Sequence, residues 1–221
     1  MSRKKFAALF FIVAAFFLVA YFYARSTLPN ISRLKTENPQ TTAFMQRYKG
    51  SKPLEFYWVP YTAISPHLKS AIIVAEDSNF FSHSGVDWGA IWEAFKKNLE
   101  ARGWKWGGST VTQQLAKNLF LSPSKHPIRK LKEFLIAEEM ERSLTKQRIL
   151  EIYLNVVEWG EGVYGAEAAA RHNFNIPAAF LSPAQAAHLA AMLPSPRYFE
   201  KTPDSEHLDQ RTLLILKRMG Y

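Results

Sequence analysis

The most unusual chemical groups in this sequence follow an apolar run. Residues 71–75 (AIIVA) lead directly into Glu76 and Asp77, and His83 and Gly85 come shortly after them. An acid at the C-terminal end of a helix opposes the helix dipole, and partial desolvation raises the pKa of a glutamate. Such a carboxylate can act as a general base near neutral pH. The structural alternative is that Asp77 caps a turn, Glu76 is solvated and His83 only makes hydrogen bonds.

A second segment places polar groups at the start of a helix. Gly107 and Gly108 form a turn that runs into residues 109–118 (STVTQQLAKN), which include Gln113 and Gln114. Backbone N–H groups, hydroxyls and paired amides at a helix N-terminus suit an anion or a sugar. The spacing is not that of a P-loop, because no Gly-Lys-Ser/Thr follows. An ordinary capped helix is the alternative.

A third segment mixes a carboxylate with cations. On a helix, Arg129, Lys132 and Glu133 fall within about 100° of one another. Lys117, Lys125 and Lys130 add further charge nearby in the sequence. Such a group could hold a diphosphate beside a second acid. The alternative is a solvated helix face with ordinary i,i+4 ion pairs.

Composition excludes several other chemistries. The 221 residues contain no cysteine, so disulfides, iron–sulfur clusters and thiol nucleophiles are excluded, and the six histidines form no metal-ligand pattern. Ser122-Pro123-Ser124-Lys125 matches Ser-x-x-Lys formally, but the sequence has no Lys-Thr-Gly partner. A net charge of +9 favours an anionic partner, whether nucleic acid, anionic lipid or a phosphorylated substrate.

The N-terminus predicts a membrane anchor. Residues 6–23 are uncharged and would span about 27 Å as a helix, close to the thickness of a bilayer core. Arg3, Lys4 and Lys5 precede this stretch, so residues 1–5 are expected in the cytoplasm and the remainder of the chain outside. A cleaved signal peptide is the alternative.

The remainder predicts a mainly α domain. Residues 24–65 read as a linker and an irregular lobe with a short strand at 54–61, and residues 66–221 form the main domain. Trp88, Trp92 and Phe95 follow a helical stripe that is either core packing or an apolar surface, whereas Trp104 and Trp106 are expected to contact lipid. Helices are predicted from Pro66 to the end of the apolar run at residue 75, from Trp88 to Leu99, and at 109–119, 128–144 and 145–155. Further helices are predicted from the turn at Gly165 to about residue 172, at 184–193 and at 205–219.

Together these segments resemble the peptidoglycan glycosyltransferases, which polymerise bacterial cell-wall glycan. The similarity covers roughly residues 65–218 and is close to the monofunctional biosynthetic transglycosylases, whose domain also occurs in class A penicillin-binding proteins. Four motifs carry it in order: Glu-Asp-x-x-Phe-x-x-His-x-Gly at 76–85, Gly-x-Ser-Thr-x-x-Gln-Gln-x-x-Lys-Asn at 107–118, Arg-Lys-x-x-Glu at 129–133 and Ile-Leu-Glu-x-Tyr-Leu-Asn at 149–155.

The resemblance implies a lysozyme-like α fold of two lobes with a membrane-proximal jaw. It implies that lipid II is polymerised with inversion to a β-1,4 link and release of polyprenyl diphosphate. Glu76 would be the general base and Glu133 the second catalytic carboxylate. The residues expected to bind substrate are Asp77, Phe80, His83, Ser109, Thr110, Gln113, Gln114, Lys117, Asn118, Lys125, Arg129, Lys130 and Lys132.

The same resemblance indicates partners and location. The expected partners are lipid II, the nascent glycan strand, membrane lipid and other proteins of cell-wall synthesis or division, but no nucleic acid. No metal site is predicted, although Mg²⁺ or Mn²⁺ could accompany the substrate diphosphate. The chain is expected to be a single-pass protein of the cytoplasmic membrane with its catalytic domain outside. The alternatives are a lysozyme-like lytic enzyme and an inert anchored scaffold.

Overall fold

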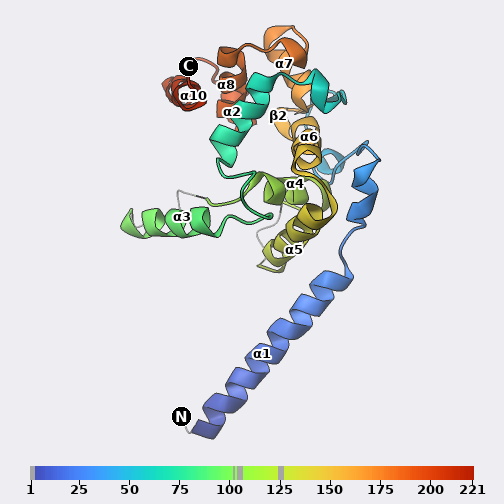
Figure 1. Cartoon of the computed structure of the whole chain (residues 1–221), viewed down its shortest axis with the longest axis vertical. Helices are drawn as coiled ribbons and strands as arrows, with labels where there is room; N and C mark the ends of the chain where they lie inside the picture. The colour runs from blue at the N-terminus through green and yellow to red at the C-terminus, as the bar shows by residue number, and fades with distance from the viewer. Residues whose placement is uncertain (1–2, 102, 104–106, 124–126) are drawn as a thin grey trace.

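A computed structural model describes residues 3–101, 103, 107–123 and 127–221, and this part of the chain is mainly helical (Figure 1). The prediction of a mainly α protein is confirmed. Trp104, Trp106 and Lys125 lie outside the described residues. The α-helices are α1 (Arg3–Ser26), α2 (Pro66–Glu76), α3 (Trp88–Glu100), α4 (Val111–Phe120), α5 (Pro127–Ser143), α6 (Lys146–Val156), α7 (Ala166–Phe174), α8 (Pro183–Met192), α9 (Pro196–Lys201) and α10 (Glu206–Met219).

The two helices on either side of the first motif, α2 and α3, each begin directly after a residue that caps them. Ser65 Oγ accepts the N–H of His67 at 3.2 Å, and Asp87 Oδ1 accepts the N–H of Ala90 at 2.8 Å. Both side chains satisfy backbone donors that the first turn of a helix leaves without a partner. Helix α2 ends at Glu76, so this acid stands at the C-terminal end of a helix as expected.

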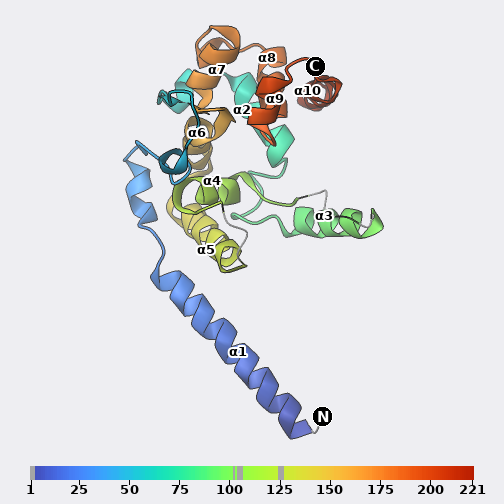
Figure 2. The same cartoon turned by 180° about the vertical axis from the view of Figure 1, so that it is seen from behind.

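Two groups of packed helices make up the body. Helix α2 packs against α8 and α10, while α4 packs against α5 and α6. The two groups lie at different heights in Figures 1 and 2, and the connection from α2 through α3 to α4 joins them. The largest fully buried side chains include Trp159, Tyr153 and Tyr164. This arrangement leaves the end of α2 facing the start of α4.

The sheet is small. Strand β3 (Val163–Tyr164) pairs in parallel with β1 (Glu55–Phe56) and antiparallel with β2 (Glu158–Gly160). The strand expected at 54–61 is wrong beyond Phe56. The side chain of Asn155 replaces a strand partner there: its Oδ1 accepts the N–H of Val59 and its Nδ2 donates to the carbonyl of Val59, both at 2.9 Å.

The segment 24–65 is packed against the body. It contains the 3₁₀ turns Ile31–Lys35, Met45–Arg47 and Tyr61–Ala63, and its residues Ile31, Met45 and Ile64 belong to the core. Arg148 on α6 holds this segment, because its Nε donates to the carbonyl of Leu34 at 2.8 Å. The linker therefore forms part of the folded domain.

Helix α1 projects away from the body (Figure 1). Within the described residues, Leu9–Ser26 is long and apolar enough to cross a membrane, and only 6% of that window is buried. The helix touches the body at its C-terminal end, where Ala24 is fully buried and α1 contacts α5. Lys132 Nζ lies 5.4 Å from the centre of the Tyr23 ring. The anchor is thus docked on the helix that carries Arg129, Lys130 and Glu133.

The aromatic stripe of α3 faces outward. Trp88 is 71% exposed and Trp92 56% exposed, and Phe95 and Leu99 are exposed too. The alternative that this stripe packs in the core is therefore wrong. Helix α3 projects from the body (Figure 1), and within its stripe Trp88 stacks on Phe134 of α5 while staying largely exposed.

Gly108 determines how closely α3 can approach the loop before α4. A Cβ on Gly108 would lie 2.8 Å from Ile91 Cα, whereas a Cβ on Gly107 would meet nothing within 4 Å. Gly108→Ala should lower the free energy of unfolding by about 1–3 kcal/mol, because backbone atoms would have to move. Gly107→Ala is the matched control and should stay within about 0.5 kcal/mol of the parent protein. Equal effects in urea unfolding would contradict this account of the α3 contact.

Candidate active site

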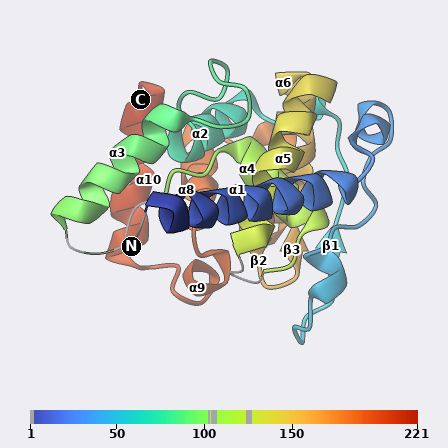
Figure 3. The same ribbon diagram turned by 90° about the horizontal axis from the view of Figure 1, so that it is seen from below.

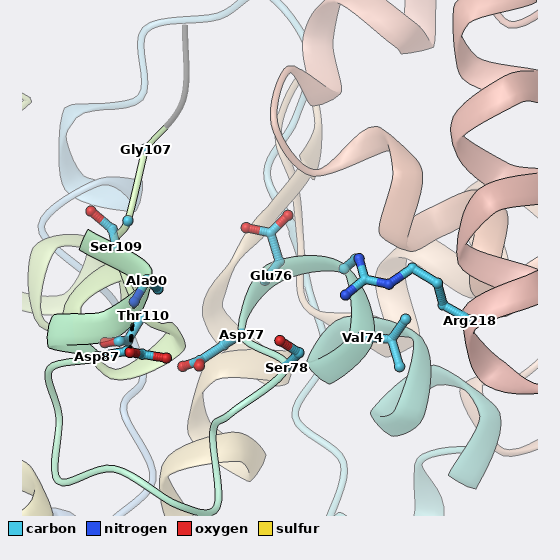
Figure 4. A pocket seen from close by; sticks show the side chains of 12 residues that line it. Val74, Glu76, Asp77, Ser78, Asp87, Ala90, Gly107, Ser109, Thr110 and Arg218 are labelled. Atoms are coloured by element: carbon cyan, nitrogen blue, oxygen red, sulfur yellow. Dashed lines mark hydrogen bonds between the residues drawn. The ribbon is translucent and has the colours of Figure 1, made fainter. Parts of the chain in front are cut away.

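A cleft of about 130 Å³ lies between the end of α2, the start of α3, the glycine loop (residues 107–110) and Arg218 of α10. Figure 4 shows Glu76 between Ser109 on one side and Arg218 of α10 on the other. Gly107, Gly108 and Thr110 complete the glycine-loop side of the wall. The first two sequence motifs therefore meet around one acid.

Glu76 is bonded to a polar pair that leads into the core. Gln114 Nε2 on α4 donates to Glu76 Oε2 at 2.8 Å, and the Tyr153 hydroxyl on α6 donates to Gln114 Oε1 at 3.0 Å. Tyr153 is fully buried. Because the tyrosine occupies the amide oxygen of Gln114, the amide nitrogen must face the carboxylate.

The surroundings of Glu76 favour its protonated form. Burial raises the pKa of Glu76, while the Gln114 hydrogen bond and the charges of Arg211 and Lys117 act in the opposite direction. The raised pKa expected from the sequence is therefore confirmed, with desolvation as its main cause. A carboxylate with a raised pKa is a stronger base than a solvated one and can accept a proton from a nearby hydroxyl.

The remainder of the first motif supports the cleft from behind. Asp77 Oδ2 accepts the N–H of Val111 at 2.9 Å, and His83 Nε2 lies 2.9 Å from Asp77 Oδ1. The N–H of Gly85 donates to His83 Nδ1 at 3.2 Å, which assigns the proton to Nε2. Phe80 is fully buried in the core. These residues tie the loop after α2 to the start of α4.

The N-terminus of α4 is satisfied from within the protein. Thr110 Oγ1 accepts the N–H of Gln113, and Gln113 Oε1 accepts the N–H of Thr110 at 3.0 Å, so the two form a capping box. Asp77 Oδ2 takes the N–H of Val111 in the same turn. Gln113 is fully buried. The capping is therefore present, and the same segment also lines the cleft at Ser109 and Thr110.

The third motif forms a compact ionic cluster. Glu133 is 3% exposed, and its two oxygens are bonded to Arg129 Nη1 at 2.8 Å and to Lys130 Nζ. Lys130 Nζ also donates to Ser109 Oγ, a residue of the cleft, at 3.1 Å. Two cations on one carboxylate leave a net positive group beside the glycine loop, and Glu133 holds both cations in place.

The charges of both acids act on the pKa of Lys117. Burial lowers the pKa of Lys117, and the charges of Glu133 and Glu76 each act to raise it. Lys117 and Asn118 line a second hollow of about 220 Å³, which Gln114 also lines. The hydrogen bond between Gln114 and Glu76 therefore links a residue that lines this hollow to a residue that lines the cleft. Lys132 is placed elsewhere, over the Tyr23 ring of the anchor.

Three residues of the site, Tyr153, Arg211 and Arg218, were not predicted from the sequence. Tyr153 lies inside the fourth motif, but nothing local shows that it reaches Gln114. The charge of Arg211 opposes the rise in the pKa of Glu76 that burial causes, and Arg218 lines the cleft. Positions 211 and 218 are two helical turns apart and so share a face of α10. That spacing was the available signal, but only tertiary packing brings α10 against α2.

The described residues do not form a metal cage. No group of three or more His, Asp and Glu side chains among them could hold an ion. Both oxygens of Glu133 are taken by cations.

Comparison with known sequences identifies the family. Residues 42–220 match the profile of the transglycosylase family. The chain belongs to the transglycosylase family. A biosynthetic peptidoglycan transglycosylase of Nitrosospira multiformis is 52% identical over 83% of both chains. One of Chromobacterium violaceum is 48% identical over 100% of this chain and 98% of its own.

Membership confirms the resemblance drawn from the four motifs and makes the chain a glycosyl-transferring enzyme. The match begins at residue 42, within the packed segment 24–65. A transglycosylase needs a group that activates a sugar hydroxyl and groups that stabilise the departing group. The cleft supplies an acid of raised pKa, and the cluster around Glu133 supplies cations.

The hydrogen bond from Gln114 should hold down the pKa of Glu76. Gln114→Met keeps the side-chain volume and removes the donor, so the pKa of Glu76 should rise further. Tyr153→Phe should cause a smaller rise, because the amide of Gln114 loses the bond that orients it. NMR titration of the labelled Glu76 carboxyl carbon measures both.

Gln210→Met serves as the control, since this glutamine lies on α10 and bonds to Glu206. It should leave the pKa of Glu76 unchanged. A lower or unchanged pKa in Gln114→Met would show that the Gln114 bond does not stabilise the ionised form.

Proposed function

We propose that this chain polymerises lipid II into peptidoglycan glycan strands at the outer face of the cytoplasmic membrane. The observation that carries the proposal is a pair of unlike acids joined by a hydrogen-bonded link: Ser109 lines the cleft with the first acid, and Lys130 bonds both to Ser109 and to the second acid. One is Glu76, which has a raised pKa; the other is Glu133, which is paired with two cations. The names of the similar proteins supply the substrate class.

The chemistry follows from these environments. Glu76 takes the proton of the acceptor sugar's 4-hydroxyl as that oxygen attacks the anomeric carbon of the donor. The bond from that carbon to the diphosphate oxygen breaks with its electron pair, and attack from the opposite face inverts the centre to give a β-1,4 link. The polyprenyl diphosphate leaves as an anion.

The leaving diphosphate needs charge stabilisation more than protonation. Arg129, Lys130 and Lys117 supply positive charge, and Glu133 orients the first two. Preorganised charges of this kind stabilise a developing anion without reorganising during the reaction. Mg²⁺ or Mn²⁺, if it takes part, travels with the diphosphate, and no step depends on it.

Two hollows beside one base suit a reaction of two substrates. The cleft and the hollow lined by Lys117 lie on either side of the Glu76–Gln114 bond. Helix α1 anchors the chain in a single pass, with residues 1–5 in the cytoplasm, and confines enzyme and lipid-linked substrates to one plane. Other proteins of cell-wall synthesis or division remain proposed partners.

Glu76→Gln should nearly abolish polymerisation. The amide keeps the shape of the side chain and removes its basicity, which contributes about 10²–10⁴ in rate. The full-length chain is incubated with pure lipid II in detergent, and the length of the product is measured. Retention of more than about a tenth of the parent rate would exclude Glu76 as the base.

The same assay separates the alternative functions. Polymer formed from lipid II supports the proposal. Shortening of a preformed glycan strand would indicate a lytic enzyme, and no change in either substrate would indicate a scaffold.

Arg129→Ala and Lys117→Ala should weaken the binding of a lipid diphosphate more than the binding of lipid-free glycan. Loss of one charge-assisted hydrogen bond corresponds to about 10–100-fold in affinity. Arg142→Ala is the matched control, because this exposed arginine on α5 pairs with Glu138 away from the cleft. Equal losses for both ligands would mean that the cations serve the fold alone.

A further inference from the structure

Arg218 brings a cation to the cleft from outside the four motifs. It lies in the last turn of α10, it is exposed, and its side chain reaches toward the end of α2 (Figure 4). Among the described residues that line the cleft, Arg218 alone is basic, whereas Glu76, Asp77 and Asp87 are acidic. An anionic part of a ligand in this cleft therefore has one cation to meet.

Each acid of the cleft has a partner other than Arg218. Asp87 accepts the N–H of Ala90 at 2.8 Å and the side-chain amide of Asn79 at 2.9 Å, and the other two acids bond to α4. Within the described part of the chain, Arg218 forms no ion pair and donates no side-chain hydrogen bond. Its guanidinium is thus available to a ligand.

The end of α10 does not by itself account for this arginine. A cation in the last turn of a helix stabilises the helix dipole, and Lys217 supplies one in the same turn. Lys217 is also exposed, but it does not line the cleft. What distinguishes Arg218 from its neighbour is its place at the cleft.

Arg218 and the cationic cluster lie on opposite sides of the base. Lys130 Nζ bonds to Ser109 Oγ, and Figure 4 shows Glu76 between Ser109 and Arg218. In an inverting transfer the acceptor attacks the anomeric carbon from the face opposite to the leaving group. With the leaving diphosphate at Lys130, the acceptor approaches from the side of Arg218.

The heights of the helices indicate which acceptor group reaches Arg218. Seen from below, α1 crosses in front of α5 (Figure 3), whereas α10 belongs to the group of helices away from α1 (Figures 1 and 2). A lipid diphosphate is tethered to the membrane that holds α1, so it stays on the side of α5. The peptide on the second sugar of lipid II carries free carboxylates and has no such tether.

We propose that Arg218 binds a carboxylate of the acceptor's peptide and so favours acceptors whose peptide is charged. This inference rests on the proposed function, which supplies lipid II as the acceptor. A guanidinium presents paired donors that match the two oxygens of a carboxylate. In this role Arg218 sets specificity and takes no part in proton transfer.

Competition between two acceptors tests the proposal. The full-length chain in detergent elongates a preformed lipid-linked glycan with lipid II whose peptide carboxylates are free or have been converted to amides. The parent protein should add the charged acceptor about 5-fold faster, the effect of one partly exposed ion pair. Arg218→Gln should remove this preference. Arg218→Lys should keep part of it, because a lysine retains the charge and loses the paired donors.

Lys217→Gln is the matched control, because it removes a cation from the same helix turn without changing the lining of the cleft. It should keep the preference of the parent protein. Lipid II without its peptide is a third acceptor, which separates the peptide from the diphosphate. Arg218→Gln should not change how this acceptor competes with the amidated one.

A binding measurement keeps the test independent of polymerisation. The side-chain Nε–H signals of isotope-labelled arginine are followed by NMR, and the signal of Arg218 is the one absent from Arg218→Gln. The lipid-free disaccharide–peptide should shift this signal, whereas its amidated form should not. A shift without polymerisation would remove the proposed function and keep the contact with Arg218.

Four results would overturn the role of Arg218 and leave the proposed function intact. These are equal addition of both acceptors by the parent protein, a preference that survives in Arg218→Gln, an equal loss of preference in Lys217→Gln, and a loss in Arg218→Gln on lipid II without its peptide. The last result would place the diphosphate, and not the peptide, at Arg218.

Discussion

The two hydrogen bonds on Asp77 hold the site together. This buried carboxylate receives the N–H of Val111 at the start of α4 and is paired with His83 from the loop after α2. Because Glu76 precedes Asp77 and Gln114 follows Val111 by one turn, the same contact sets the base against its amide partner. Loss of one bond would leave a buried charge partly uncompensated, which is far more costly than loss of a surface pair.

The protein gives its two glutamates opposite environments. Burial raises the pKa of Glu76 against the opposing hydrogen bond from Gln114, whereas Glu133 is paired with cations that compensate its charge. Two carboxyl groups can serve different purposes in one site when their surroundings differ in this way. Lys117 lies within the field of both, so a change at either acid is felt by the same ammonium group.

The side that faces the anchor is organised differently from the body. Helix α1 docks on α5 at Tyr23 and Lys132, and α3, at about the height of α4 and α5 in Figure 1, has an exposed aromatic stripe. Soluble monomers seldom expose apolar patches of this kind. Polar and apolar contacts are therefore neighbours on α5. Lys130 bonds to Ser109 of the cleft, Phe134 stacks with Trp88, and Lys132 contacts Tyr23 of the anchor.

Local patterns in the sequence were enough to predict every described α-helix except α9, the apolar N-terminal helix and the four motifs, because these depend on local periodicity and on short-range spacing. The sequence also indicated a raised pKa for Glu76 from the position of this acid after an apolar run. The positions and contacts of the motif residues depend on the tertiary structure. Phe80 and Gln113 are buried, Lys132 points to the anchor, and Asn155 replaces the strand expected after Phe56. Only packing between distant segments brings Tyr153 to Gln114 and α10 to the cleft, since such contacts leave no period or spacing in the local sequence.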